Sequence, residues 1–167
     1  MTDLLETPLA AEARRAAYDD VDALAEWSSW ASFLQALPEA PRSPGVYLFR
    51  EPDSGVVRYV GMAGERAGSG RPQGLYGRLS VHRTGNTAVS GFGEAALDLA
   101  LADEAWVEAR LERLRTRGPE RSRHWARDAV ARLAPEVRWS AQPDAADARL
   151  LEARAVQLLR PFGLWNR

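Results

Sequence analysis

The chain of 167 residues has no cysteine and no lysine, so all 22 of its basic residues are arginine. Without cysteine it can form no disulfide, no thiol nucleophile and no thiolate metal site. It also lacks an apolar run long enough to span a bilayer, and its first residues do not show the basic and then apolar pattern of a signal peptide. We therefore expect a cytoplasmic protein that has no membrane partner.

The apolar content of 46% is enough for a sizeable core. Apolar residues recur at helical spacing over residues 9–37, and a proline-rich connector follows at 38–44. We expect two parts in the chain. An N-terminal helical extension with its connector covers residues 1–42, and the main domain covers residues 43–167.

The formal net charge of −1 hides blocks of opposite sign. Residues 56–83 carry five arginines against one glutamate, and residues 110–138 carry nine arginines against four acidic residues. Residues 1–42 (eight acids, three arginines) and 84–109 (five acids, no base) each sum to −5. A nucleic-acid enzyme needs local positive potential of this kind. Alternating blocks are also typical of solvated helix faces, which is our interpretation for residues 84–138.

Residue patterns predict three strands and several helices in the main domain. Segments rich in β-branched and aromatic residues predict strands, and apolar residues at helical spacing predict helices. The glycine-rich stretch 62–74 is interpreted as a loop, because it lacks the Gly-Lys-Ser/Thr signature of a P-loop. The expected strands are 45–50, 56–61 and 136–140, and the expected helices are 75–83, 94–117, 119–134 and 145–160.

The stretch between the first two strands, residues 51–55, favours a hairpin turn. If Arg50 pairs with Val56, then Tyr47 lies opposite Tyr59 and the two phenols share one face of the sheet. A slip of one residue would separate the phenols. The same register places two further side chains on this face, those of Phe49 and Val57.

Three more side chains suited to chemistry lie on expected helices. Arg78 and His82 are four residues apart, so they project from the same side of the helix at 75–83. Glu152 lies in the middle of the last helix, nine residues before Pro161. Each has a structural explanation when taken alone, because such residues are often solvated or ion-paired on a helix surface.

Taken in order, these residues form a pattern. The order Gly45-Val46-Tyr47, Tyr59-Val60-Gly61, Arg78, Glu152 and Asn166 resembles the GIY-YIG nuclease family, and the Arg-x-x-x-His spacing is similar to its restriction-type members. The resemblance implies an α/β fold of α+β type, with a three-stranded antiparallel sheet flanked by helices. It implies a metal-dependent DNA endonuclease whose catalytic residues are Tyr47, Tyr59, Arg78, His82, Glu152 and Asn166.

The resemblance also implies a mechanism. Glu152 is the metal ligand for Mg²⁺, with Mn²⁺ as a substitute, while water and phosphate oxygens complete the shell. Arg78 offers a planar fork that matches phosphate. The base that activates water stays open between Tyr47, Tyr59 and His82. A phenol with a pKa near 10 needs help to act near neutral pH, whereas an imidazole with a free pKa of about 6.5 does not.

One departure from the family favours an alternative function. Many members have lysine after the second triplet, where this chain has Met62. A catalytically weak or inactive nucleic-acid-binding module on the same scaffold is therefore the second hypothesis. DNA is the expected partner in both. A homodimer could form through the aromatic residues of the N-terminal segment, and a restriction role would require a partner methyltransferase, which a single chain does not reveal.

Overall fold

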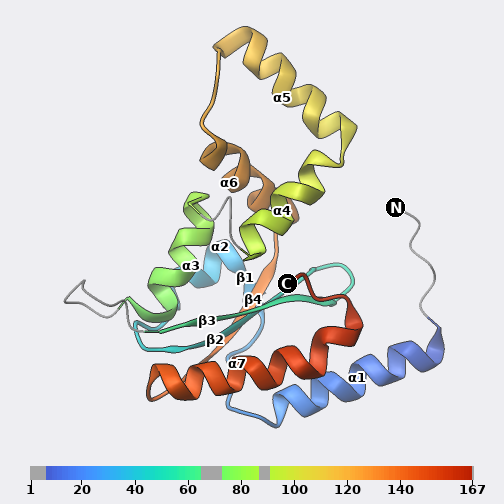
Figure 1. Ribbon diagram of the computed structural model, residues 1–167, viewed down its shortest axis with the longest axis vertical. Helices are drawn as coiled ribbons and strands as arrows, with labels where there is room; N and C mark the ends of the chain where they lie inside the picture. The colour runs from blue at the N-terminus through green and yellow to red at the C-terminus, as the bar shows by residue number, and fades with distance from the viewer. Residues whose placement is uncertain (1–6, 65–72, 87–90, 167) are drawn as a thin grey trace.

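The computed structural model describes residues 7–64, 73–86 and 91–166, and an antiparallel sheet lies at its centre (Figure 1). The three expected strands are confirmed. The sheet nevertheless has four strands in the order β1-β4-β2-β3, so the expectation of three strands is wrong. The strands are β1 (Ala31–Ser32), β2 (Gly45–Arg50), β3 (Val57–Ala63) and β4 (Glu136–Ala141).

The extra strand comes from the N-terminal segment, where one long helix at 9–37 was expected. Helix α1 ends at Asp22, and the chain then runs along β4, where the Ser28 N–H donates to the Trp139 carbonyl at 2.8 Å. The Trp27 indole N–H donates to the Val21 carbonyl at 3.0 Å, and the guanidinium groups of Arg50 and Arg138 both lie over the Trp30 ring. These contacts hold the segment off a helical path. Its elements are α1 (Pro8–Asp22), β1, α2 (Phe33–Ala36) and the 3₁₀ turn η1 (Leu37–Glu39).

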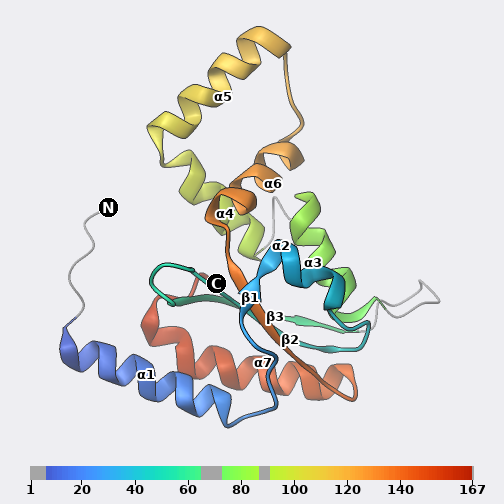
Figure 2. The ribbon, with the colours of Figure 1, turned by 180° about the vertical axis from the view of Figure 1, so that it is seen from behind.

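Two hydrophobic layers enclose the sheet (Figure 1, Figure 2). The face that carries Tyr47, Phe49 and Tyr59, here called the tyrosine face, is covered by α2, α3, α4 and α6. The opposite face, which carries Val46, Leu48 and Val60 and is here called the α7 face, is covered by α7 and α1. The covering helices are α3 (Gly74–Thr84), α4 (Gly91–Leu101), α6 (Ser122–Leu133) and α7 (Ala145–Leu159).

The β2–β3 register differs from the expected one by two residues. Tyr47 pairs with Gly61 and Phe49 pairs with Tyr59, and an irregularity at Phe49 and Arg50 then shifts the ladder by one. Since side chains alternate with a period of two, the two-residue shift keeps both phenols on the tyrosine face. The irregularity turns Val57 over, so that it packs on the α7 face and not beside Phe49 as expected.

The remaining helices follow the expectations except at one break. The helix expected at 94–117 is two helices, α4 and α5 (Glu104–Arg117), because Asp103 caps α5 by accepting the Trp106 backbone N–H at 3.1 Å. Helices α3, α6 and α7 confirm their predictions. The stretch Gly68-Ser69-Gly70 of the expected loop lies outside the described residues. Within the described ranges no helix is both long and apolar enough to cross a membrane.

Replacement of Phe33 by alanine tests whether the N-terminal segment is part of the core. Phe33 is 1% exposed and its ring meets Phe49 edge-on with centroids 5.0 Å apart. We expect Phe33→Ala to lower the free energy of unfolding by about 3–5 kcal/mol, since it leaves a cavity. The control is Leu34→Ala on the same short helix, where Leu34 is 54% exposed. Chemical denaturation that gives the two variants equal stability would contradict the packing.

Candidate active site

Five of the six expected site residues converge where α3 meets the β3 edge of the sheet. Tyr47 comes from β2 and Tyr59 from β3, and their ring centroids are 6.3 Å apart. Arg78 and His82 come from α3, which packs on the same face of the sheet. Glu152 comes from α7 on the other side, yet its charge influences the pKa of both phenols.

The Tyr47 hydroxyl and the His82 imidazole form a buried pair. The Tyr47 oxygen lies 2.8 Å from His82 Nε2, and neither residue is exposed to solvent. Burial, followed by the nearby Arg78 charge, lowers the pKa of His82 to about 3, so its ring is neutral near pH 7. Within the described residues His82 Nδ1 has no hydrogen-bond partner, so the Tyr47 hydroxyl is the one hydrogen-bond partner of this imidazole there.

Arg78 is the positive charge that serves both phenols. Burial is the largest influence on the pKa of Tyr47 and raises it, and Tyr59 raises it further, while Arg78 opposes this through its charge and hydrogen bonding. The pKa of Tyr59 is also raised by burial and lowered by Arg78. Both phenols are therefore protonated in the free protein, and Arg78 is the group that favours their ionised forms.

The glycines of the two triplets are explained by close approaches. A Cβ on Gly61 would overlap the ring and hydroxyl of Tyr47, which lies across it in the β2–β3 pair. A Cβ on Gly45 would overlap the Ser140 carbonyl of β4 and meet the Leu75 side chain of α3 at 2.7 Å. Gly61 thus makes room for the Tyr47 hydroxyl, and Gly45 lets α3 approach the sheet.

Glu152 reaches the site around the edge of the sheet. The apolar residues of α7 pack on the α7 face, but β3 is an edge strand, so a side chain from α7 can meet its outer backbone groups. The Glu152 carboxylate accepts a hydrogen bond from the Met62 backbone. Burial raises its pKa, while that hydrogen bond and the charge of Arg78 lower it in part. The carboxylate is thus half-buried and lies within electrostatic reach of Arg78.

A cleft of about 270 Å³ opens between the end of β3 and α3. Arg78 forms part of its wall, and its buried Nε atom has no hydrogen-bond partner in the described part of the chain. A buried guanidinium donor without a partner favours an anionic ligand. The other lining residues include Met62, Ala63, Gly77 and Val81.

The donor set near Arg78 fits a hard divalent cation held by one carboxylate. Among the described ranges no cluster of three or more acidic or histidine side chains is present to enclose an ion. Mg²⁺ commonly keeps several waters and binds through one or two carboxylates together with substrate phosphates. Glu152 offers one such carboxylate beside Arg78, so the residues present match that mode of binding.

Asn166 lies apart from the phenols and supports the strand that carries one of them. Its Oδ1 accepts the Val60 N–H at 3.0 Å, and its Nδ2 donates to the Val60 carbonyl at 2.7 Å. Next to it, the Trp165 N–H donates to the Arg58 carbonyl at 2.7 Å. The chain end therefore pairs with the outer edge of β3, with both hydrogen-bonding groups of the Asn166 amide engaged.

Two contributors were absent from the expected set. The Phe92 backbone N–H, at the start of α4, hydrogen bonds to the Tyr59 hydroxyl, and the Phe92 ring stacks on Trp165 with centroids 5.9 Å apart. A Cβ on Gly91 would overlap the same hydroxyl. In the sequence, Gly91-Phe92 could be found only as the start of a helix. Nothing in that pair indicates a contact with Tyr59.

No family model matches this chain, and no curated protein or solved structure matches it either. The geometry of the residues themselves is therefore the basis for a function. A phenol–imidazole pair, a second phenol and a half-buried carboxylate lie around Arg78, which lines one cleft.

The buried imidazole gives a testable pH dependence. The pKa of His82 is about 3 in the folded chain and about 6.5 when unfolded, so between these values only the unfolded state binds the proton. We therefore expect the free energy of unfolding to fall by about 1 kcal/mol per pH unit as the pH decreases from 6.5 to 5. His82→Gln should flatten this dependence in denaturant titrations.

The other histidine provides the control. His124→Gln should retain the full loss of stability between pH 6.5 and 5. The raised pKa of Glu152 acts with the opposite sign, because a carboxyl that is protonated more readily in the folded state gains stability as the pH falls, and this contribution is common to all three proteins. The assignment to His82 fails if His82→Gln keeps the wild-type slope.

Proposed function

We propose that the protein is a divalent-metal-dependent endonuclease that hydrolyses phosphodiester bonds in DNA. The observation that carries this proposal is the convergence of Tyr47, His82 and Arg78 with Glu152 at the edge of one sheet, although they come from three elements, β2, α3 and α7. The resemblance of the ordered residues to GIY-YIG nucleases supports it independently of the geometry. Together they suggest a site for an anionic phosphate ester.

Arg78 is the group that binds the scissile phosphate. It lines the cleft, it is half-buried, and its Nε donor has no partner in the described residues. A planar guanidinium can donate two parallel hydrogen bonds to phosphate oxygens. Negative charge that develops on those oxygens during water attack is then stabilised by a fixed cation in a poorly hydrated site.

Tyr47 and His82 are the groups that take the proton of the attacking water. As the water transfers a proton to the Tyr47 oxygen, Tyr47 passes its own proton to His82 Nε2, 2.8 Å away. The low pKa of His82 in the free protein opposes this step. A bound anionic phosphate beside Arg78 raises the pKa of the imidazole, because it offsets the positive charge that lowers it.

Glu152 is the residue that would hold the metal ion. A divalent cation bound there supplies charge neutralisation at the phosphate and at the departing 3′ oxygen. The hydrogen bond from the Met62 backbone fixes the carboxylate at the strand edge, and the raised pKa reflects how poorly it is solvated without a cation.

A second function is favoured by the depth of the phenol–imidazole pair. Tyr47 and His82 are fully buried, and Met62 stands where many GIY-YIG enzymes have lysine. Both features suit a nucleic-acid-binding module without turnover. Binding to duplex, branched and damaged DNA without cleavage in Mg²⁺ or Mn²⁺ would favour this module over the nuclease.

Removal of the Glu152 charge is the direct test of the proposed nuclease. We expect Glu152→Gln to reduce Mg²⁺-dependent nicking of plasmid DNA by at least about a hundredfold, because the amide cannot replace a carboxylate ligand. Its carbonyl can still accept the Met62 hydrogen bond, so the melting temperature should stay close to that of the wild type. The matched control is Glu12→Gln on the exposed surface of α1, which should cleave normally.

Comparison of the two phenols tests the proton pathway. Tyr47 is hydrogen bonded to the imidazole, whereas the Tyr59 hydroxyl accepts the Phe92 N–H. We expect Tyr47→Phe to lower kcat by about 10²–10⁴, the usual contribution of a general base, and Tyr59→Phe to lower it by less than tenfold. Single-turnover cleavage at saturating protein would measure both. Equal losses would refute the assignment of Tyr47 as the proton acceptor.

A further inference from the structure

Helix α5 projects away from the rest of the molecule (Figure 1, Figure 2). Of its 14 residues, only Arg110 is buried, and its leucines Leu111 and Leu114 are 40% and 42% exposed. A helix that adds so little to the core gains little stability from packing. We call α5 together with residues 118–123 the arm.

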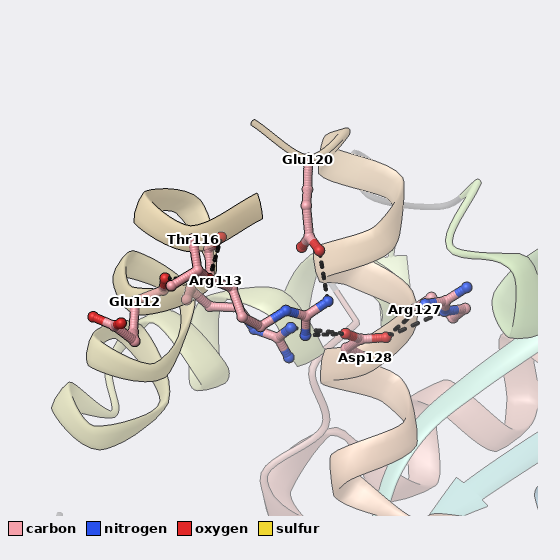
Figure 3. A network of polar contacts seen from close by, with 7 residues as sticks. Glu112, Arg113, Thr116, Glu120, Arg127 and Asp128 are labelled. Carbon is pink, nitrogen blue, oxygen red and sulfur yellow. Dashed lines mark hydrogen bonds and ion pairs between the residues drawn. The ribbon is translucent and has the colours of Figure 1, made fainter. Parts of the chain in front are cut away.

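The arm is held to α6 by charged groups. Arg113 donates to Glu120 at 2.6 Å and to Asp128 at 3.3 Å, as Figure 3 shows, and Arg110 donates to Asp128 at 2.8 Å. The Trp106 ring meets the Trp125 ring edge-on beside these pairs. The two acidic side chains nearest the turn, Glu120 and Asp128, are thus engaged by arginines on the inner side of the arm.

The segment that runs from the end of α5 to the first turn of α6 is strongly basic. Residues 115–123 hold four arginines and one glutamate, which sum to +3. Arg115 has a partner in Glu112 at 3.6 Å, in a pair that is exposed. The other three arginines are exposed and make no ion pair with any residue that the structure describes, and together they form the basic tip: Arg117, Arg121 and Arg123.

The basic tip is coupled to the helix that carries the candidate catalytic residues. Gly85, which ends α3 in a left-handed conformation, packs so closely on α6 that a Cβ there would overlap the Arg123 carbonyl and meet the Arg127 nitrogen at 2.8 Å. Helix α3 also carries Arg78. The position of the tip relative to the cleft is therefore set by helix-to-helix contact.

We propose that the basic tip binds the phosphate backbone of duplex DNA beside the bond that is cleaved. This inference rests on the proposed function and adds a substrate requirement to it. Exposed arginines that are free of acidic partners bind phosphate oxygens and release counterions, a contribution that does not depend on base sequence. The acidic residues of the arm lie along α5 or face inward, so the tip itself presents positive charge.

The contact between Gly85 and Arg123 sets the substrate requirement. Gly85 follows Arg78 by seven residues, which is roughly 10 Å along α3 or about three base pairs of duplex. The preferred substrate is therefore a duplex that continues past the cleavage point far enough to meet the tip. A duplex that stops short of the arm is bound by the cleft alone.

The test compares two pairs of arginine substitutions with the same change in charge. The tip variant is Arg121→Gln with Arg123→Gln. The control variant is Arg15→Gln with Arg154→Gln, two exposed arginines on α1 and α7, which cover the opposite side of the sheet. Binding of the full-length chains to a duplex of about 40 base pairs is measured in EDTA across a salt series, and cleavage is measured separately in Mg²⁺.

We expect the tip variant to reduce the slope of log K against log salt by about 2 and to lose at least about tenfold in affinity at low salt. The control variant should match the wild type in both slope and affinity. Equal slopes for the tip variant and the wild type would overturn the inference and would indicate that the tip serves another partner, such as an acidic protein. The comparison of salt slopes tests the tip whether or not the wild type cleaves DNA.

The cleavage measurement separates the outcome for the nuclease from the outcome for the basic tip. If the wild type cleaves plasmid DNA and the tip variant keeps the wild-type slope, the nuclease stands and the role of the tip is refuted. If no protein cleaves but the tip variant loses slope and affinity, the nuclease is refuted and the role of the tip in binding DNA stands. Circular dichroism melting of both variants at the wild-type temperature guards against loss of fold.

Discussion

The pairing of β2 with β3 is the constraint on which the rest of the site depends. It places Tyr47 across from Gly61, so that the phenol has room above a residue without a side chain and its hydroxyl can meet His82. A side chain at Gly61 would displace Tyr47, and the phenol–imidazole pair would be lost with it. Helix α3 can supply Arg78 and His82 to the same point because Gly45 lets it approach the sheet closely.

The second constraint is that β3 has no neighbouring strand on its outer side. An open edge leaves backbone N–H and carbonyl groups to be satisfied by other parts of the chain. The Glu152 carboxylate accepts a hydrogen bond from the Met62 backbone, and the Asn166 amide bonds to both the N–H and the carbonyl of Val60. The carboxylate can therefore lie near residues of the tyrosine face although its helix packs on the α7 face. One edge strand thus joins the two halves of the candidate site.

Periodicity was sufficient to predict that the phenols share a face, since an error of two residues in register leaves the alternation unchanged. It was insufficient for Val57, because a strand irregularity has no signature in the alternation. Periodicity also failed to predict two helix ends. The apolar spacing continues past Asp103, where a helix cap starts a new helix, and past the end of α1, where Trp27 contacts Val21. Strand β1 pairs over two residues only, which is too short for an alternating pattern to show. The reach of Glu152 around the sheet edge depends on how α7 and β3 pack in three dimensions, which a linear pattern does not contain.

The chain end that covers β3 also governs how the sheet can meet other chains. Because the Asn166 amide and the Trp165 nitrogen occupy outer backbone groups of Val60 and Arg58, that border cannot accept an added strand without first releasing the tail. The other border, β1, is two residues long and offers too few groups to template one. Self-association through a continuous intermolecular sheet is therefore disfavoured at both margins, and copies that associate must do so through helices or side chains.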